Sequence, residues 1–445
     1  FFGSAGVVEA VRLVVDGEPI ESRDIPVELP RFAIAGKPIA AKLAATGNAR
    51  FALESPPSGA KLAAAGDFAW TPAANQLGEF PLRVLVARKS GAVDERLVLP
   101  HTLNVVSAAD AQRAGGDPAK VDKLYRLPLG SEKIHVANGA DGQSLLVLDG
   151  KKVTRLVGDG MTVAETWELP AVCERIAERP ASFVALSDEK KALLLIDKKT
   201  SRIERVVQMD YFRRHDLALH PTKPWVYVSA SVSRGGDLID SFMIVDETTG
   251  DVQEPEGLPG TWLATSRDGK SLYVGEKQYR FNASFDSLAS YDLREIKRPY
   301  TRNIKYEPGA NGRGLVLSAD GKRVSYLTFT GYPMYSKNVA AWDTSDLEKR
   351  PVIYPCKEQG ASCFWIAFHP RLPFAAAPIE SGGAVCFHRE TGEPIPGAVN
   401  VSYPPLGNVI VDRLYFSPDG NNLLLECQGA GERFLRRVPL QLPAK

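Results

Sequence analysis

Short apolar runs separated by turn residues follow one another along almost the whole chain. A phrase made of an apolar run, a Ser or His, a polar turn and a second apolar run returns seven times. Its clearest copies are Thr265–Lys270, Leu317–Lys322 and Phe416–Gly420, each centred on Asp-Gly. Strand-like runs that repeat at intervals of about 45 residues are typical of β-propellers. The pattern therefore predicts an all-β protein in which a seven-bladed β-propeller occupies most of the chain.

Four further copies of the phrase are degenerate, and in two of them a His replaces the Ser. In every copy, the run before the turn is predicted to be the inner strand of a blade and the run after it the second strand. The Asp-Gly and His-Pro pairs are interpreted as tight turns, since Gly supplies a positive φ and short polar side chains bond nearby backbone. The degenerate copies are Ala140–Gln143, Leu186–Lys190, Leu219–Lys223 and Phe368–Arg371.

The ring can be closed by the two ends of the repeat region, residues 122–445. The last copy has three strands and ends near Phe434–Val438, whereas Lys123–Leu129 precedes the first copy as an unpartnered apolar run. If this run joins the last blade as its outer strand, two exposed sheet edges are removed. The sequence thus predicts a closure in which one early strand completes the last blade.

The N-terminal quarter of the chain follows a different pattern. Residues 1–25 are predicted to form a β-hairpin, interpreted as the end of a missing upstream domain. Residues 26–106 show short alternating strands separated by Gly and Pro, which is typical of a β-sandwich with Trp70 as a core residue. Residues 107–121 are small and polar, and we expect them to be a linker without a core of its own.

Both regions resemble known families. The phrase Gly66–Pro72, followed by Gln76–Phe80, resembles the bacterial putative-Ig and cadherin-like domains, although their calcium motifs are not evident here. The repeats resemble the WD40-like and YVTN-type propellers of bacterial proteins. These resemblances imply an N-terminal Ig-like β-sandwich that acts as a spacer or adhesion module, before a propeller. They also imply an extracytoplasmic location, in the periplasm or at the cell surface.

Charge and composition exclude some classes of function. The formal net charge is +1 and no block of Lys and Arg occurs, so we expect no nucleic-acid partner. No apolar run reaches the roughly 18 residues that span a bilayer, so membrane insertion is not expected. The five cysteines have irregular spacing, which favours buried thiols over a disulfide framework or a zinc site. A local bridge between Cys356 and Cys363 stays open, and no metal or cofactor is predicted.

The candidate binding residues lie in three long connections between the second and third strands of adjacent blades. Those connections should emerge on one face of the ring, and their Tyr, Phe and Arg residues are of the types that anchor interfaces. The alternative is that these aromatic side chains pack on neighbouring blades. The connections are Ser231–Asp240, Glu276–Phe285 and Thr328–Lys337, with Tyr279, Phe281, Tyr332 and Tyr335 as the candidate residues.

A second group of candidates precedes the inner strand of the third blade. Tyr211, Arg213 and His215 form the most polar and aromatic entrance to any blade, close to the central channel. A plain loop with satisfied polar groups is the alternative interpretation.

Three functions remain open, because no catalytic motif is present. The first is a non-enzymatic interaction or scaffold module, whose partner is another protein or another domain of a longer parent chain. The second is a hydrolase or lactonase-like enzyme with its site in the propeller channel. The third is an architectural part of a large cell-surface protein.

Overall fold

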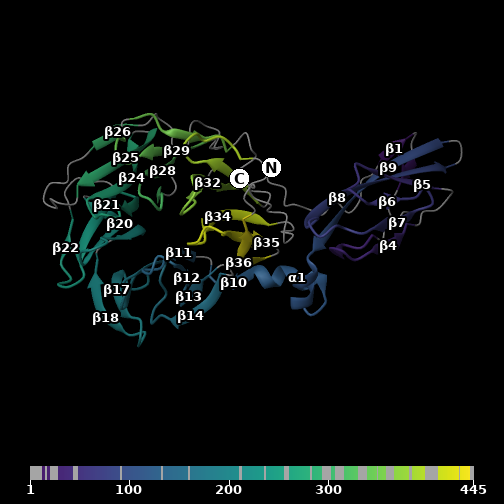
Figure 1. Ribbon diagram of the computed structural model, residues 1–445. Coiled ribbons are helices and arrows are strands. Elements are labelled where there is room, and N and C mark those ends of the chain that lie inside the picture. The colour runs from purple at the N-terminus through teal and green to yellow at the C-terminus, as the bar shows by residue number, and fades with distance from the viewer. Residues whose placement is uncertain are drawn as a thin grey trace. The chain divides into compact units, whose positions relative to one another are not determined.

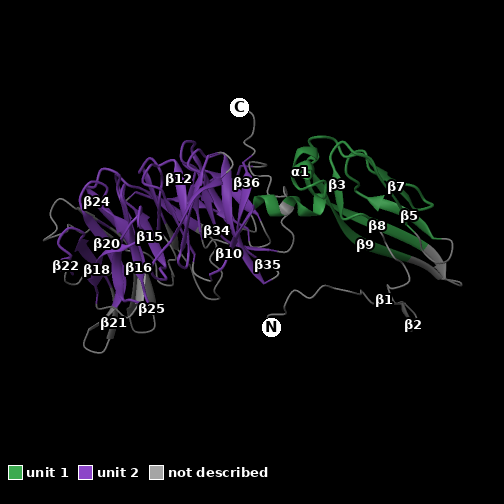
Figure 2. Ribbon diagram, turned by 90° about the horizontal axis from the view of Figure 1, so that it is seen from below, with its two compact units in different colours: residues 1–125, 401–406 green, residues 126–400, 407–445 purple. Residues whose placement is uncertain are grey.

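The computed structural model divides into two compact units, residues 1–125 with 401–406 and residues 126–400 with 407–445 (Figure 2). No helix among the described residues is long and apolar enough to cross a membrane. The residues that the structure describes are 13–15, 18–20, 29–43, 49–90, 93–131, 134–158, 161–209, 213–234, 237–254, 260–280, 283–292, 302–305, 315–328, 338–347, 349–356, 365–379, 383–395, 409–429 and 431–440.

The first unit contains two larger sheets and a separate hairpin, β1 (Leu13–Val15) with β2 (Glu18–Ile20). One sheet has the strand order β3-β9-β8-β5 and the other β4-β7-β6. Only β3 and β9 pair in parallel among the described strands of these sheets. The strands are β3 (Phe32–Ile34), β4 (Ile39–Lys42), β5 (Arg50–Glu54), β6 (Lys61–Leu62), β7 (Asp67–Trp70), β8 (Gly78–Ser90) and β9 (Val93–Val106).

Both sheets bury alternate residues in one shared core. On β7, Phe68 and Trp70 are buried while Asp67 and Ala69 are exposed. Leu82 and Val84 of β8 belong to the same cluster. The Trp70 ring packs edge-on against Phe80, and its Nε1 donates a hydrogen bond to the Ser58 carbonyl at 3.1 Å. Trp70 is thus a core residue, as its position in the sequence predicts.

The segment expected to be a linker forms two helical pieces instead, α1 (Ala108–Arg113) and the 3-10 helix η2 (Pro118–Tyr125). The Ser107 hydroxyl caps α1 by accepting a hydrogen bond from the Asp110 backbone N–H at 3.0 Å. The Tyr125 hydroxyl then donates to the Asp110 carboxylate at 2.9 Å. Ala111 and Tyr125 are buried in a small cluster that includes Leu77. Small residues suggest a linker, but here they let two short helices pack closely.

The second unit is a ring of small antiparallel sheets (Figure 1). Its described residues form six four-stranded sheets and one three-stranded sheet, β31-β32-β33. The strands are β10 (Arg126–Leu129), β11 (Ile134–Asn138), β12 (Ser144–Asp149), β13 (Lys152–Val157), β14 (Thr162–Glu168), β15 (Arg175–Glu178), β16 (Ser182–Ser187), β17 (Ala192–Asp197), β18 (Ile203–Gln208), β19 (Arg213–Leu219), β20 (Trp225–Arg234), β21 (Asp237–Asp246), β22 (Val252–Gln253), β23 (Trp262–Thr265), β24 (Ser271–Arg280), β25 (Ala283–Asp292), β26 (Arg302–Lys305), β27 (Leu315–Leu317), β28 (Arg323–Thr328), β29 (Asn338–Asp343), β30 (Val352–Tyr354), β31 (Ala367–Phe368), β32 (Phe374–Pro378), β33 (Ala384–His388), β34 (Ile410–Phe416), β35 (Asn422–Gly429) and β36 (Glu432–Pro439).

The first strand of each sheet lies at the centre of the ring. The strands β11, β15, β19, β23, β27, β31 and β34 contact one another in this order along the chain. Consecutive strands of a sheet run antiparallel, so all turns between first and second strands lie on one face of the ring. The connections between second and third strands lie on the opposite face. We call these the turn face and the hairpin face.

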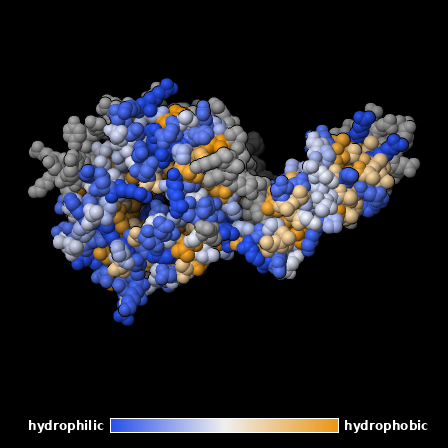
Figure 3. Space-filling view, viewed as in Figure 1, coloured by the Kyte–Doolittle hydropathy of each residue, from blue (hydrophilic) through white to orange (hydrophobic). Residues whose placement is uncertain are grey.

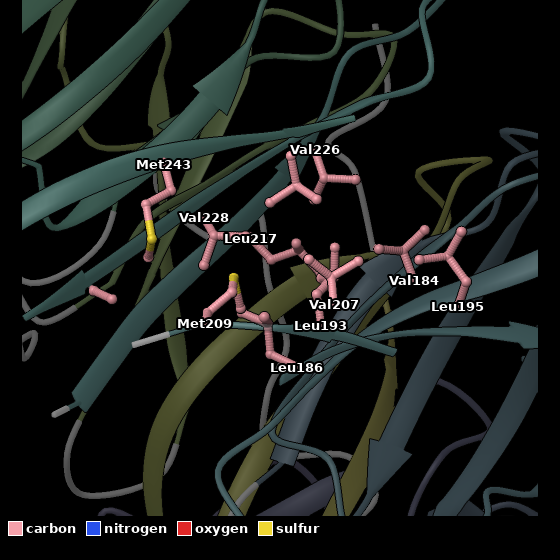
Figure 4. Close-up of a cluster of buried hydrophobic side chains, with 12 residues drawn as sticks. Val184, Leu186, Leu193, Leu195, Val207, Met209, Leu217, Val226, Val228 and Met243 are labelled. Carbon is pink, nitrogen blue, oxygen red and sulfur yellow. The ribbon is translucent and has the colours of Figure 1, made fainter. Parts of the chain in front are cut away.

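Neighbouring sheets pack face to face, and alternate residues of one strand serve two different cores. On β12, Leu146 and Leu148 pack toward the next sheet, whereas Leu145 and Val147 pack toward the last sheet of the chain. This division follows from the period of two in a strand. It explains why these strands are continuously apolar. Figure 4 shows one such core, between the sheets that contain β17 and β20.

The ring closes by the pairing that the sequence predicts. Strand β10 pairs antiparallel with β36, in a register that sets Leu127 opposite Leu435. Leu435 also packs in one core with Ile134 and Val136 of β11. The last sheet is therefore completed by an early strand and packs on the first sheet.

For one copy of the repeat, the prediction of a turn between the first and second strands is wrong. Leu186–Lys190 lies between the second and third strands, β16 and β17, and Leu193–Ile196 belongs to the third strand. The equivalent of the Asp-Gly turn is the short connection after Glu178, where Arg179-Pro180 stands. The error arises because β16 and β17 are both short, apolar and followed by charged turn residues.

The His-Pro and Asp-Gly turns of neighbouring sheets hold each other. His369 Nδ1 accepts hydrogen bonds from the backbone of Arg371 and Leu372 at 3.0 and 2.9 Å, which shapes its own turn. Its Nε2 lies 3.0 Å from the Gly420 carbonyl of the next sheet. His220 accepts from the backbone of its own turn in the same way. These histidines therefore act as turn residues, as predicted. Both rings also lie against the Asp-Gly turn of the next sheet, His220 against Gly269 and His369 against Gly420.

Replacing Gly420 with Ala should destabilise the ring more than replacing Gly321. Both glycines have positive φ, of 80° and 72°, which costs an L-residue about 1 kcal/mol. A Cβ at Gly420 would also overlap the His369 ring, whereas at Gly321 it would meet nothing within 4 Å. We expect Gly420→Ala to lose at least about 2 kcal/mol of unfolding free energy and Gly321→Ala about half of that, measured by urea unfolding. Equal losses would contradict the link between the turns.

Candidate functional site

Four of the residues singled out in the sequence lie outside the described residues, namely Tyr211, Phe281, Tyr332 and Tyr335. Their proposed roles stay predictions.

The other three lie on strands whose register places them toward the hairpin face. Arg213 begins the inner strand β19 and pairs with Ser231, close to the end of β20. His215 lies within β19 rather than before it, and is the extra residue of a β-bulge. Tyr279 pairs with Ser284 near the tip of the β24–β25 hairpin. The topology thus brings Arg213, His215 and Tyr279 to one face.

Two of the three predicted long loops are hairpin extensions of neighbouring sheets. Strands β20, β21, β24 and β25 have ten residues each, whereas β16 and β17 have six. Pairing of β20 with β21 continues to Arg234–Asp237, and that of β24 with β25 to Arg280–Ala283. Figure 2 shows β21 and β25 on the same side of the ring. Most of the third predicted loop, residues 329–337, lies outside the described residues.

The outer parts of these hairpins are paired with each other only, among the described strands. The inner strand β23 reaches no further along β24 than Gly275, and β26 pairs with β25 only over Ser287–Ser290. The segments Glu276–Arg280 and Ala283–Asp286 therefore have edges whose backbone groups point away from their own sheet. Such edges can accept an added strand.

A group of polar and aromatic side chains lies where the inner strands begin, toward the same face. Figure 3 shows the ring hollowed near its middle. The inner strands, which contact one another in chain order, surround this central channel. All members of the group are half-buried. The channel cluster consists of His135 on β11, Arg175 on β15, Asp216 on β19, Trp365 just before β31, and Arg413 and Tyr415 on β34.

Two of the cluster residues directly follow a β-bulge. The register of β19 shifts between Arg214 and Asp216, and that of β34 shifts between Val411 and Arg413. A bulge inserts one residue into a strand and turns the next side chain to a different direction, and bulges are common beside functional sites. The bulges break the alternation of both strands next to Asp216 and Arg413.

His135 is held as a neutral hydrogen-bond donor. Its Nδ1 accepts a hydrogen bond from the Ile176 backbone N–H at 3.2 Å, so Nε2 carries the proton of the neutral ring. Burial lowers the pKa of His135 well below its ordinary value, and the charges of Arg175 and Arg413 lower that pKa further. The imidazole therefore stays uncharged at neutral pH.

Asp216 is the carboxylate of the cluster. One of its oxygens accepts a hydrogen bond from the Leu263 backbone N–H at 3.0 Å, and the other lies 3.7 Å from Arg175 Nε. Burial raises the pKa of Asp216 above its ordinary value, although the charge of Arg175 opposes this change. Behind the cluster, Glu426 is paired with Arg433 at 3.2 Å.

Arg413 is held by aromatic groups. Its guanidinium lies over the Trp365 ring, 5.2 Å from the ring centroid, and interacts with the side chain of Tyr415. Trp365 is fixed in turn, because its Nε1 donates to the Leu414 carbonyl at 2.8 Å. Burial raises the pKa of Tyr415 to about 12, so its hydroxyl stays protonated at neutral pH.

Sequence reasoning missed most of this cluster, for an identifiable reason. Arg175 begins β15, but the misplaced turn at Leu186–Lys190 assigned it to the preceding blade. Arg413 and Asp216 lie one residue out of the alternating pattern because of the bulges. A search for charged residues shortly before each turn that joins a first strand to a second strand would have found Asp216 and Arg413.

Metal ligands and thiols add no further site within the described residues. There, no group of three or more His, Cys, Asp or Glu side chains is arranged to hold a metal ion. The side chains of Cys173, Cys356, Cys386 and Cys427 are buried. Cys363 lies outside the described residues, so its bridge to Cys356 stays a prediction.

Comparison with known proteins identifies the fold of the second unit as a β-propeller. No family model and no curated protein match the sequence. A chain of Kuenenia stuttgartiensis hydrazine synthase matches in structure with a TM-score of 0.51 and 15% identity, over 69% of this chain and 96% of that chain. The β-propeller domain of Myceliophteria thermophila Cps50 (Swd1) matches with a TM-score of 0.52 and 13% identity, over 70% and 97%. At these identities the likeness concerns the fold alone.

Replacing His135 with Asn should reduce the loss of stability on acidification. When the pKa of a His is lower in the folded state than its unfolded value of about 6.5, the unfolded state binds the proton first as the pH falls. The free energy of unfolding therefore decreases below about pH 6.5, until the folded state is protonated too. Below that value the loss is up to about 1.4 kcal/mol per pH unit. Asn keeps an acceptor for the Ile176 N–H but does not titrate. Urea unfolding at pH 7.5 and 5.5 measures the difference.

The exposed His388 provides the matched control. The variant His388→Asn should keep the full pH dependence of the wild type. If His135→Asn shows the same dependence as His388→Asn, the buried neutral imidazole is not present.

Proposed function

We propose that this protein is a non-enzymatic interaction module that docks a partner on the hairpin face of its propeller. The partner would be another protein or another domain of a longer parent chain. The observation that carries the proposal is the pair of adjacent hairpins, β20–β21 and β24–β25, which extend past the inner strands of their own sheets.

The entropy cost of holding the extended hairpins in one conformation explains why they favour docking. Fixing a residue costs about 1–2 kcal/mol of conformational entropy, and a two-stranded ribbon alone is at best marginally stable. In the described register, the outer part of β24–β25 gains no pairing from β23 or β26. A partner strand added along an edge would supply main-chain hydrogen bonds and would hold the ribbon.

We also propose a finer assignment of the two units. The second unit would be a seven-bladed propeller of the WD40-like or YVTN type. The seven sheets of its described residues and the pairing of β10 with β36 support this count. The first unit would be an Ig-like sandwich that acts as a spacer, supported by its two sheets around Phe68 and Trp70.

Shortening both hairpins should abolish partner capture without unfolding the propeller. In one hairpin, Asn-Gly would replace residues 232–239, which preserves the Ser231–Asp240 pair. In the other, Asn-Gly would replace residues 278–285 and preserve Lys277–Asp286. Asn-Gly forms the type I′ turn that joins paired strands. Using cross-linking on extracts of the source cells and quantitative mass spectrometry, we expect recovery of the partner to fall at least about ten-fold.

The control alters the turn face instead, by the double substitution Arg267→Ala and Lys270→Ala at exposed positions. This variant should recover the partner as the wild type does, and all variants should unfold at similar urea concentrations. Unchanged recovery by the shortened protein, or no specific partner for the wild type, would refute docking on the hairpin face.

A further inference from the structure

The channel cluster carries more positive than negative charge on its own wall. Arg175 and Arg413 contribute two cations, and Asp216 is the carboxylate that stands beside them. The charges of both arginines act on His135 and on Asp216, which places all four groups close together. Behind the cluster, Arg433 pairs with the buried Glu426 at 3.2 Å and with Asp412 at 3.4 Å, and the charges of both carboxylates also act on Arg413.

Arg413 is pre-organised to receive an anion. Among the residues that the structure describes, no carboxylate lies within ion-pair distance of its guanidinium, although Glu426 and Asp412 act on it electrostatically from further away. The planar group is instead held over Trp365 and beside Tyr415, which limits its motion. A fixed guanidinium can bind a carboxylate through two parallel hydrogen bonds, and it loses little side-chain entropy on binding.

His135 can complement this binding. Since its Nδ1 is occupied by the Ile176 N–H, the remaining Nε2–H is a neutral donor. A neutral donor stabilises an anion without adding a charge that would have to be desolvated. The rings of Trp365 and Tyr415, with centroids 5.8 Å apart, supply an apolar surface beside the charged groups.

We propose that the channel cluster binds a small organic anion, with its carboxylate on Arg413 and its apolar part against Trp365 and Tyr415. Arg175 adds a second positive charge and His135 a neutral donor. Because the cluster lies toward the hairpin face, the ligand would enter there. The site is independent of the docking surface proposed above, since its residues lie on the inner strands or directly before one of them and not on the extended hairpins.

Calorimetric titration of the full chain with benzoate tests this proposal, because benzoate joins one carboxylate to a flat apolar ring. We expect saturable binding that weakens at least about ten-fold in Arg413→Gln. Arg413→Lys keeps the charge but loses the planar fork, so it should also bind more weakly than the wild type. The control Arg202→Gln, at an exposed turn position, should bind as the wild type does.

A second measurement requires no variant at Arg413. In protein labelled with 5-fluorotryptophan, the six Trp residues give separate fluorine signals, and Trp365→Phe assigns one of them. Benzoate should shift the Trp365 signal with the same dependence on concentration as the calorimetric titration.

Any of the following results would overturn the proposal. The first is absence of benzoate binding up to about 10 mM. The second is equal affinity in Arg413→Gln and the wild type, or a Trp365 signal that does not move. The third is inorganic phosphate binding as tightly as benzoate, which would refute the apolar contribution and hence the organic anion.

Discussion

Burial of both faces of every small sheet is the interaction on which the second unit depends. Strands with a period of two present one set of side chains to each neighbour, so Leu146 and Leu145 of β12 enter different cores. A single sheet would leave both faces in water, at a cost of about 25 cal/mol for each Å² of apolar surface. Each sheet therefore requires two neighbours. In the closed ring, the first and last sheets pack against each other, so that neither has a face left in water.

The turns contribute to the same arrangement, since they are shared between sheets as well as within them. His369 shapes its own turn through Nδ1 and reaches Gly420 of the next sheet through Nε2. Arg179 acts similarly between the second and third sheets, where it donates to the carbonyls of His220 and Lys223 and pairs with Glu247 at 2.6 Å. Polar contacts on the turn face thus fix the spacing that the apolar cores require.

The beginning of the inner strands differs, because their side chains there face the central channel instead of a neighbouring sheet. Charged residues such as Arg175 and Asp216 can lie there half-buried, with partners supplied by other strands. Two bulges mark this region, and they place Asp216 and Arg413 where a regular strand would not. The hairpin extensions rise on the same face, so the least regular parts of the ring lie together.

Local patterns in the sequence are sufficient for the all-β fold, the repeat, the Asp-Gly and His-Pro turns, and the pairing of β10 with β36. The first three depend on strand period or turn chemistry, which neighbouring residues determine. The last depends on the unpartnered apolar run before the first copy and on the removal of exposed sheet edges. The tertiary structure alone decided the turn to which Leu186–Lys190 belongs, because two similar apolar strands can be told apart only by their partners. It also decided that residues 107–121 form helical segments and that His135, Arg175, Asp216 and Arg413 meet. Those side chains come from four different sheets, and no local pattern records the bulges or the packing of the inner strands that bring them together.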